Sequence, residues 1–193
     1  MLIRKPTVAD GPALTRLLGD AWNAAYPNAG LGISPELIAA FTAAYAQRNS
    51  KPDANELFAK MIVDPNRVYL VAEIDNKPVG FINAIRKSPK HNDAEIVSLY
   101  VDPHYFSRGI GYALLTAAFK KLGATNVHLT VASYNERAVT FYERNGFRKI
   151  PNSDHLYQIS AAPTADSTQP SLMVGKNAIP VFNMIHLSTA IIS

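Results

Sequence analysis

The chain contains no cysteine among its 193 residues. This absence excludes disulfide bonds, cysteine-ligated metal sites and catalysis through a thiol nucleophile. Long apolar runs are also missing, because no segment approaches membrane-spanning length and the first ten residues lack the apolar core of a secretory signal. We therefore expect a cytoplasmic protein, and no pattern of residues indicates a metal site.

Charge of one sign is not concentrated in any segment either. The formal net charge is +4, from 19 basic and 15 acidic residues, and the basic residues are scattered rather than gathered into a stripe with interleaved aromatics. This distribution argues against nucleic-acid binding. The length and the 48% hydrophobic content are those of one compact domain with a substantial core.

The most informative segment joins a strand, a glycine-bearing loop and a helix. Residues 95–101 are apolar and β-branched, as in a half-buried strand, and a helical stripe begins at Tyr112. The loop at 107–111 therefore lies at a helix N-terminus, where unpaired N–H groups and the helix dipole favour an anion. Gly109 and Gly111 allow a ligand to approach the backbone closely. The segment predicts a pyrophosphate site, and the alternative is a tight turn that only starts a helix.

Two common nucleotide signatures are absent from this loop. A dinucleotide fingerprint needs a third glycine and an acidic residue roughly 20 positions further on. A P-loop needs Gly-Lys-Ser/Thr. The sequence contains neither, so we expect a cofactor other than a nicotinamide dinucleotide or a nucleoside triphosphate.

A second block, residues 135–147, reads NERAVTFYERNGF. Asn135 is a good helix N-cap, and Tyr142 lies on the apolar face of the helix that it would begin. Asn145-Gly146 supplies a left-handed stop. The block therefore predicts a short helix with defined ends.

The two blocks, in this order, resemble the signatures of the GNAT superfamily of acyl-CoA-dependent N-acyltransferases. The family's phosphate loop reads Gln/Arg-x-x-Gly-x-Gly/Ala, and its second signature places Asn-x-x-Ala-x-x-x-Tyr before a Gly-Phe turn. Phe106 stands where the family usually has Gln or Arg, so one anchoring side chain is missing. The resemblance implies an α/β (α+β) fold: a mixed, mostly antiparallel sheet of about seven strands, flanked by helices and containing a splayed cofactor cleft.

The elements predicted from residue patterns fall in the family's order. They are a strand at 2–4, three helices beginning near Leu14, Ser34-Pro35 and Asp53, a hairpin of 67–74 and 78–85, and strands at 126–131, 147–159 and 172–174. The resemblance covers residues 1–175. Residues 176–193 form an apolar C-terminal extension of unknown role, which packs on the domain, pairs with a second subunit or is a frayed end.

The resemblance implies acetyl-CoA as co-substrate, and a mild positive charge suits its phosphates. Backbone groups of the strand before the loop would hold the pantetheine arm, and the loop and following helix would hold the pyrophosphate. The cofactor-binding candidates are Leu99, Val101, Ser107, Arg108, Gly109, Ile110, Gly111, Tyr112, Ala113, Asn135 and Tyr142.

The implied chemistry is direct attack of an amine on an acyl thioester in a ternary complex. Tyr142 is the candidate general acid, because a phenol can protonate a thiolate; the alternative is that it only packs against the sheet. Glu95 is the candidate general base and Glu73 the second, with a water relay in either case. Glu95 could instead be a solvated strand-end carboxylate. Many relatives have a glutamate where this chain has Thr130.

Candidate substrate contacts are Trp22, Tyr26, Glu73 and Tyr100, although each aromatic is as consistent with the core. We expect acetyl transfer to a primary amine of a small molecule, either polyamine or amino-acid-like. A polycation would need clustered carboxylates, and only Asp93 and Glu95 supply them. The alternatives are protein N-terminal or lysine acetylation and a non-catalytic acyl-CoA sensor. A homodimer is possible; no nucleic-acid or membrane partner is expected.

Overall fold

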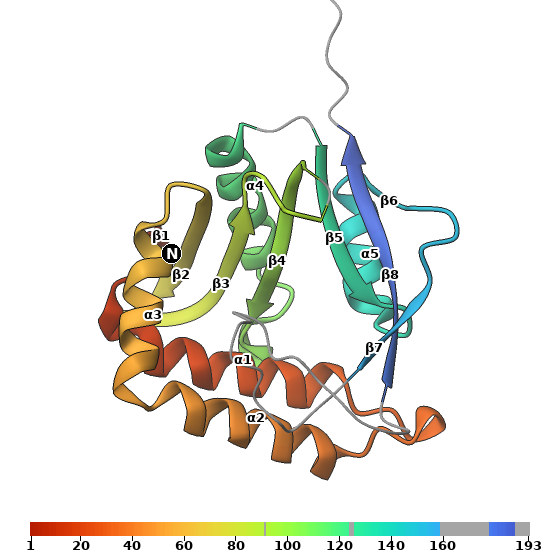
Figure 1. The fold of residues 1–193 in the computed structure, drawn as a ribbon, viewed down its shortest axis with the longest axis horizontal. Coiled ribbons are helices and arrows are strands. Elements are labelled where there is room, and N and C mark those ends of the chain that lie inside the picture. The colour runs from red at the N-terminus through yellow and green to blue at the C-terminus, as the bar shows by residue number, and fades with distance from the viewer. Residues whose placement is uncertain (91, 124–125, 159–177, 188–193) are drawn as a thin grey trace, which may run out of the picture.

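The computed structural model describes residues 1–90, 92–123, 126–158 and 178–187 (Figure 1). They form an eight-stranded sheet in the order β1-β2-β3-β4-β5-β8-β6, with β7 also paired to β8. The strands are β1 (Leu2–Arg4), β2 (Arg67–Ile74), β3 (Lys77–Ile85), β4 (Ala94–Val101), β5 (Asn126–Ala132), β6 (Phe147–Lys149), β7 (His155–Gln158) and β8 (Ala178–Leu187). The helices are α1 (Gly11–Ala25), α2 (Pro35–Asn49), α3 (Pro52–Val63), α4 (Ile110–Leu122) and α5 (Glu136–Arg144), with short 3-10 turns at Val8–Asp10, Ala29–Leu31 and Pro103–Tyr105.

The sheet separates two hydrophobic cores. Along β2, Leu70 and Ala72 pack in the core formed with α4 and α5, whereas Val71 packs in the core formed with α1 and α2. Neighbouring residues of a strand point to opposite faces, so the two groups of helices cover opposite faces of the sheet. The mixed, mostly antiparallel sheet flanked by helices is confirmed.

Local signals begin the N-terminal helices largely as predicted. The Ser34 hydroxyl accepts a hydrogen bond from the Leu37 N–H at 3.2 Å and caps α2, with Pro35 at its first position. The third helix starts two residues earlier than a capping box at Asp53 would start it, because Lys51 is its N-cap and Pro52 its first residue. Asp53 therefore lies inside α3 and is not its cap.

A β-bulge in β4 lies where the sheet opens. Asn83 of β3 pairs with Ser98, but its neighbour Ala84 pairs with Ile96, so Val97 is the extra residue. The parallel ladder between β4 and β5 ends at the same point, with Ile96 opposite Leu129, although both strands continue. The predicted splay between these strands is therefore present.

The described part of the C-terminal extension, residues 178–187, packs on the domain, which is one of the three roles expected for it. Residues 178–187 form β8, which pairs along its length with β5 and also with β6 and β7. Both faces of β8 are covered, because Met184 is fully buried in one core and Ile179 in the other. This burial explains its apolar residues on both faces. The strand predicted over 147–159 is two short strands, β6 and β7, and the one predicted at 172–174 lies outside the described residues.

Candidate active site

The glycine loop before α4 has the backbone of an anion site. Gly109 has φ +76° and Ser107 has φ +61°, so the chain turns sharply before the helix begins at Ile110. The first intrahelical bond runs from the Ala113 N–H to the Gly109 carbonyl at 3.0 Å. The N–H groups of Ile110, Gly111 and Tyr112 precede that bond and have no carbonyl partner within the helix. Such a cradle fits a pyrophosphate.

Two of the residues predicted as loop contacts already have partners in the structure. The Ala113 N–H already donates within α4, so this amide is not one of the free donors. The Arg108 guanidinium lies 5.1 Å from the centre of the Tyr105 ring, where it stacks beside the loop. Gly109, Ile110, Gly111 and Tyr112 keep the geometry that the phosphate-site prediction requires.

Helix α5 is positioned by its cap and by its contact with the loop. The Asn135 side chain accepts a hydrogen bond from the Ala138 N–H at 3.1 Å, which confirms it as the N-cap. A Cβ placed on Gly111 would lie 3.4 Å from the Phe141 ring, so a side chain at that position would crowd α5. The start of α4 therefore packs closely against α5 at Gly111.

Tyr142 lies on α5 and is buried between Phe141 and Phe147, whose ring centres are 5.2 and 5.4 Å away. Burial raises the pKa of Tyr142 well above the usual phenol value, and the nearby Tyr26 phenol raises it further. The hydroxyl therefore stays protonated at neutral pH, as a proton donor must. Tyr26 itself packs in the core on the opposite face of the sheet.

Leu99 and Val101 lie in the part of β4 that β5 no longer accompanies. Both still pair with β3, opposite Ile82 and Gly80, and their side chains pack against the core formed with α4. A pantetheine arm would lie along the edge of β4 that faces β5. There it would form hydrogen bonds with the backbone as an added strand does.

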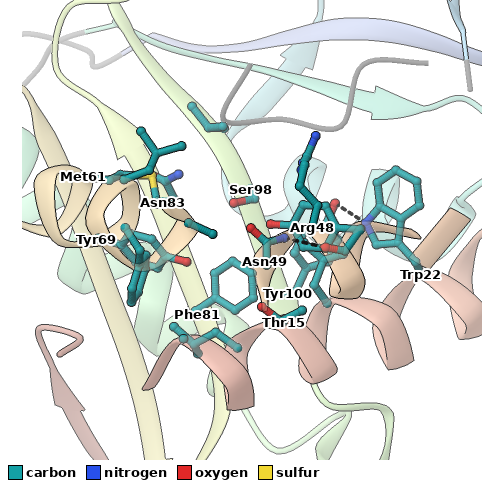
Figure 2. Close-up of a pocket in the computed structure, with 18 of the residues that line it drawn as sticks. Thr15, Trp22, Arg48, Asn49, Met61, Tyr69, Phe81, Asn83, Ser98 and Tyr100 are labelled. Carbon is teal, nitrogen blue, oxygen red and sulfur yellow. Dashed lines mark hydrogen bonds between the residues drawn. The ribbon is translucent and has the colours of Figure 1, made fainter. Parts of the chain in front are cut away.

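A cavity of about 760 Å³ opens on the other face of the sheet (Figure 2). It lies between α1, α2 and α3 on one side and the central strands on the other. Eight aromatic residues line it: Trp22, Tyr26, Tyr45, Phe58, Tyr69, Phe81, Tyr100 and Tyr157. The structure thus brings three of the four predicted substrate residues, Trp22, Tyr26 and Tyr100, to one cavity.

Hydrogen bonds order three of these aromatic residues. The Trp22 Nε1–H donates to the Tyr100 hydroxyl at 2.8 Å, and Figure 2 shows the indole turned toward that phenol. The Tyr100 hydroxyl is in turn hydrogen-bonded to Tyr26. Burial raises the pKa of both Tyr26 and Tyr100, so both phenols remain neutral. The three residues form a connected, uncharged wall.

Glu95 lines the same cavity and is 6% exposed. Its Oε2 accepts a hydrogen bond from the Ser88 hydroxyl, and its Oε1 lies 3.1 Å from the Lys90 Nζ. The Lys90 side chain is 63% exposed, so it can leave without unpacking the core. Glu95 is therefore a buried carboxylate with one buried partner, Ser88, and one exposed partner, Lys90, rather than a solvated strand-end group.

Glu73, the second base candidate and a predicted substrate contact, is not brought to the cavity. Its Oε2 lies 2.6 Å from the Arg4 Nη2, and Arg4 also pairs with Asp10 at 2.8 Å. This triad joins β2 to the N-terminal segment, and the guanidinium of Arg4 lowers the pKa of Asp10 to about 2. Glu73 has a structural role that its sequence neighbours do not reveal.

Several cavity residues were not predicted. Arg48 and Asn49 come from the last turn of α2, and Tyr69 and Asn83 from the hairpin (Figure 2). No short motif marks them, because only the packing of α2 against the sheet brings them to the cavity. Thr130, which stands where many relatives have a glutamate, lines the cavity and donates to the Asn183 amide oxygen at 2.8 Å.

Two features are absent from the described residues. No helix among them is both long and apolar enough to cross a membrane. Among the same residues, no cluster of three or more histidines and carboxylates could hold a metal ion.

A comparison with protein families identifies the family of this chain. The family model described as the acetyltransferase (GNAT) family matches residues 34–147, more than half of the chain. The chain therefore belongs to the GNAT acetyltransferase family and is an N-acetyltransferase.

Several known acetyltransferases are similar to this chain, each over a different share of its own length. An uncharacterized N-acetyltransferase of Methanocaldococcus jannaschii is 41% identical over 42% of this chain, a match that spans only 39% of that relative. A spermidine N(1)-acetyltransferase of Thermoplasma acidophilum is 29% identical over 79% of this chain and 90% of its own length. The N-alpha-acetyltransferase RimI of Mycobacterium tuberculosis is 28% identical over 71% of this chain and 96% of its own.

A solved structure has the same fold. The PaiA N-acetyltransferase from Thermoplasma acidophilum, crystallised in complex with coenzyme A, superposes with a TM-score of 0.65. The match covers 96% of this chain and 98% of that protein, at 24% identity. At this identity the likeness shows the fold alone.

Proposed function

We propose that this enzyme transfers an acetyl group from acetyl-CoA to the primary amine of a small molecule with an aromatic or apolar body, of the amino-acid-like type. The observation that carries the proposal is the aromatic cavity, which contains one deeply buried carboxylate, Glu95. Aromatic faces bind an apolar body and attract an ammonium group.

The charges around the cavity favour a monoamine over a polyamine. Among the described lining residues, three are basic and two acidic: Arg48, Lys51, Lys90, Asp53 and Glu95. Glu95 is already paired with Lys90. A polycation needs an excess of carboxylates, whereas an amino-acid-like substrate could place its own carboxylate near Arg48. The spermidine-acetylating relative makes the polyamine the necessary comparison in any test.

The proposed mechanism uses Glu95, which lines the cavity on one face of the sheet, and Tyr142, which lies on the other face. Acetyl-CoA, when bound, supplies an activated thioester. Glu95, directly or through a water molecule, accepts the proton that the substrate ammonium must lose before its nitrogen has a free electron pair. Tyr142 donates its phenolic proton to the departing thiolate and is reloaded from solvent. The N–H groups on the edge of β4 that β5 leaves beyond Ile96 would stabilise the developing oxyanion.

The test is release of free thiol from acetyl-CoA against a panel of aromatic monoamines, amino acids, spermidine and short peptides. We expect the highest kcat/KM with an aromatic monoamine or an aromatic amino acid. Preference for spermidine would overturn the substrate proposal. Preference for a peptide amino terminus would favour protein acetylation, the activity named for the RimI relative. Binding of acetyl-CoA with no thiol release on any amine would indicate a sensor.

A further inference from the structure

Phe106 occupies the loop position where the family usually has a polar anchoring side chain, and Arg137 covers its ring. The Cζ of Arg137 lies 3.1 Å from the centre of the Phe106 ring. A guanidinium stacked in this way is held by cation–π attraction. The loop lacks the family's polar side chain at residue 106, and Arg137 of α5 places a positive charge at the same position.

A second contact places Arg137 beside the phosphate loop independently. Phe141 lies one helical turn after Arg137, on the same face of α5. Its ring is 3.4 Å from where a Cβ on Gly111 would lie. Two successive turns of α5 thus touch the two ends of the loop, Phe106 before it and Gly111 at the start of α4.

The Arg137 guanidinium lacks an anionic partner. Its side chain makes no hydrogen bond or ion pair with any other residue that the structure describes, whereas Arg4 is bound by two carboxylates. Partial burial lowers the pKa of Arg137, and no carboxylate offsets that effect. Stacking uses only the face of the group, so its in-plane N–H donors remain available for a planar or tetrahedral oxyanion.

We propose that Arg137, oriented by the ring of Phe106, binds a phosphate of coenzyme A and replaces the anchoring side chain that residue 106 does not provide. The proposal rests on acetyl-CoA being the co-substrate. The backbone cradle of Ile110, Gly111 and Tyr112 would bind the pyrophosphate from one side, and Arg137 would add a charge-assisted contact from α5. Phe106 is a positioning residue in this arrangement.

The test measures binding of coenzyme A by calorimetry in the absence of any amine. We expect Arg137→Ala to raise the Kd by about tenfold, as loss of one charge-assisted contact does. Arg144→Ala is the matched control, because it removes the same charge from the other end of α5, at a position that is exposed as Arg137 is. We expect it to change the Kd by less than about twofold. The Tm of each variant checks that the fold is intact.

Two further comparisons separate a phosphate contact from a purely structural role. Phe106→Leu removes the platform, and in combination with Arg137→Ala it should add little to the loss, because the two residues act as one unit. Phe106→Gln restores the family's side chain and should recover affinity in the Arg137→Ala background. Repeating the titrations with 3′-dephospho-coenzyme A identifies the phosphate: an equal loss indicates the pyrophosphate, and a loss seen only with coenzyme A indicates the 3′-phosphate.

An unchanged Kd in Arg137→Ala would overturn the proposal, as would equal losses in the Arg137 and Arg144 variants. Fully additive losses in the double variant would show that Phe106 does not orient Arg137. If the unaltered protein does not bind coenzyme A, then acetyl-CoA is not the co-substrate and the proposed function itself fails. That outcome is distinct from one in which coenzyme A binds but Arg137 does not contact it.

Discussion

The Lys90 Nζ lies 3.1 Å from the Oε1 of Glu95, so the lysine ammonium occupies the position beside the carboxylate that a substrate ammonium would need. Lys90 is on an exposed loop, whereas Glu95 is held on β4 and hydrogen-bonded to Ser88. If Glu95 is the base, as proposed, a substrate ammonium that contacts it directly must first displace Lys90. The pair predicts that these two residues affect different kinetic constants.

We expect Lys90→Met to lower the KM for the amine severalfold without lowering kcat, because the competing cation is removed. Glu95→Gln should lower kcat by about 100-fold, within the range for loss of a general base. Steady-state kinetics with saturating acetyl-CoA measure both. The matched control is Glu73→Gln, which alters a carboxylate paired with Arg4 away from the cavity and should lower the Tm but not kcat. Equal kcat values for the two glutamine variants would refute the role of Glu95.

Tyr142→Phe should lower kcat by about 100-fold with little change in the Kd for acetyl-CoA, because it removes a proton donor and keeps the ring that packs on Phe147. Burial raises the pKa of Tyr142 well above 10, so its loss of a proton should not produce a falling limb in kcat below about pH 10. A pH profile of kcat checks this. Unchanged turnover in the variant would assign Tyr142 to packing alone.

The buried tyrosines predict a loss of stability in alkaline solution. Burial raises the pKa of Tyr157 to about 12, whereas a phenol in the unfolded chain titrates near 10. Below pH 10 both states are protonated and the stabilisation is complete. As the pH rises from 10 toward 12, the unfolded state loses its proton first and the free energy of unfolding falls. Urea unfolding between pH 9 and 11.5 should show this decrease, and Tyr157→Phe should make it shallower.

Residues of β8 should contribute to stability as core residues do. Met184 is fully buried and pairs with Leu129 of β5, so Met184→Ala should lower the free energy of unfolding by about 2–5 kcal/mol. Leu187, at the exposed end of the same strand, is 62% exposed, and Leu187→Ala should cost less than about 0.5 kcal/mol. Chemical unfolding measures both. If both substitutions lower the free energy of unfolding by less than about 0.5 kcal/mol, β8 does not contribute to the core.

Local features were predictable because their causes are local. Ser34 caps α2 and Asn135 caps α5 through hydrogen bonds that span three residues. Gly109 permits the left-handed turn before α4 with no long-range contact. Each of these signals is a short-range steric or hydrogen-bonding preference, so it survives in any fold that contains the segment.

Features that depend on pairing over long separations were not predictable in the same way. The pattern of β8 does not reveal a partner, because a strand buried on both faces has no alternation to indicate its register. Glu73 and Glu95 are both strand carboxylates in the sequence. Only the positions of Arg4 and of the cavity distinguish the structural carboxylate from the catalytic candidate.

The sequence by itself determined the family, the glycine loop before α4, the caps at Ser34 and Asn135 and most of the elements, since motif spacing and local preferences carry that information. The tertiary structure alone decided that β8 completes the sheet, that Trp22, Tyr26 and Tyr100 share one cavity, and that Arg137 covers Phe106. Those contacts join segments far apart in the chain. They form because burying apolar surface on both faces of one sheet leaves few arrangements in which all these side chains can pack.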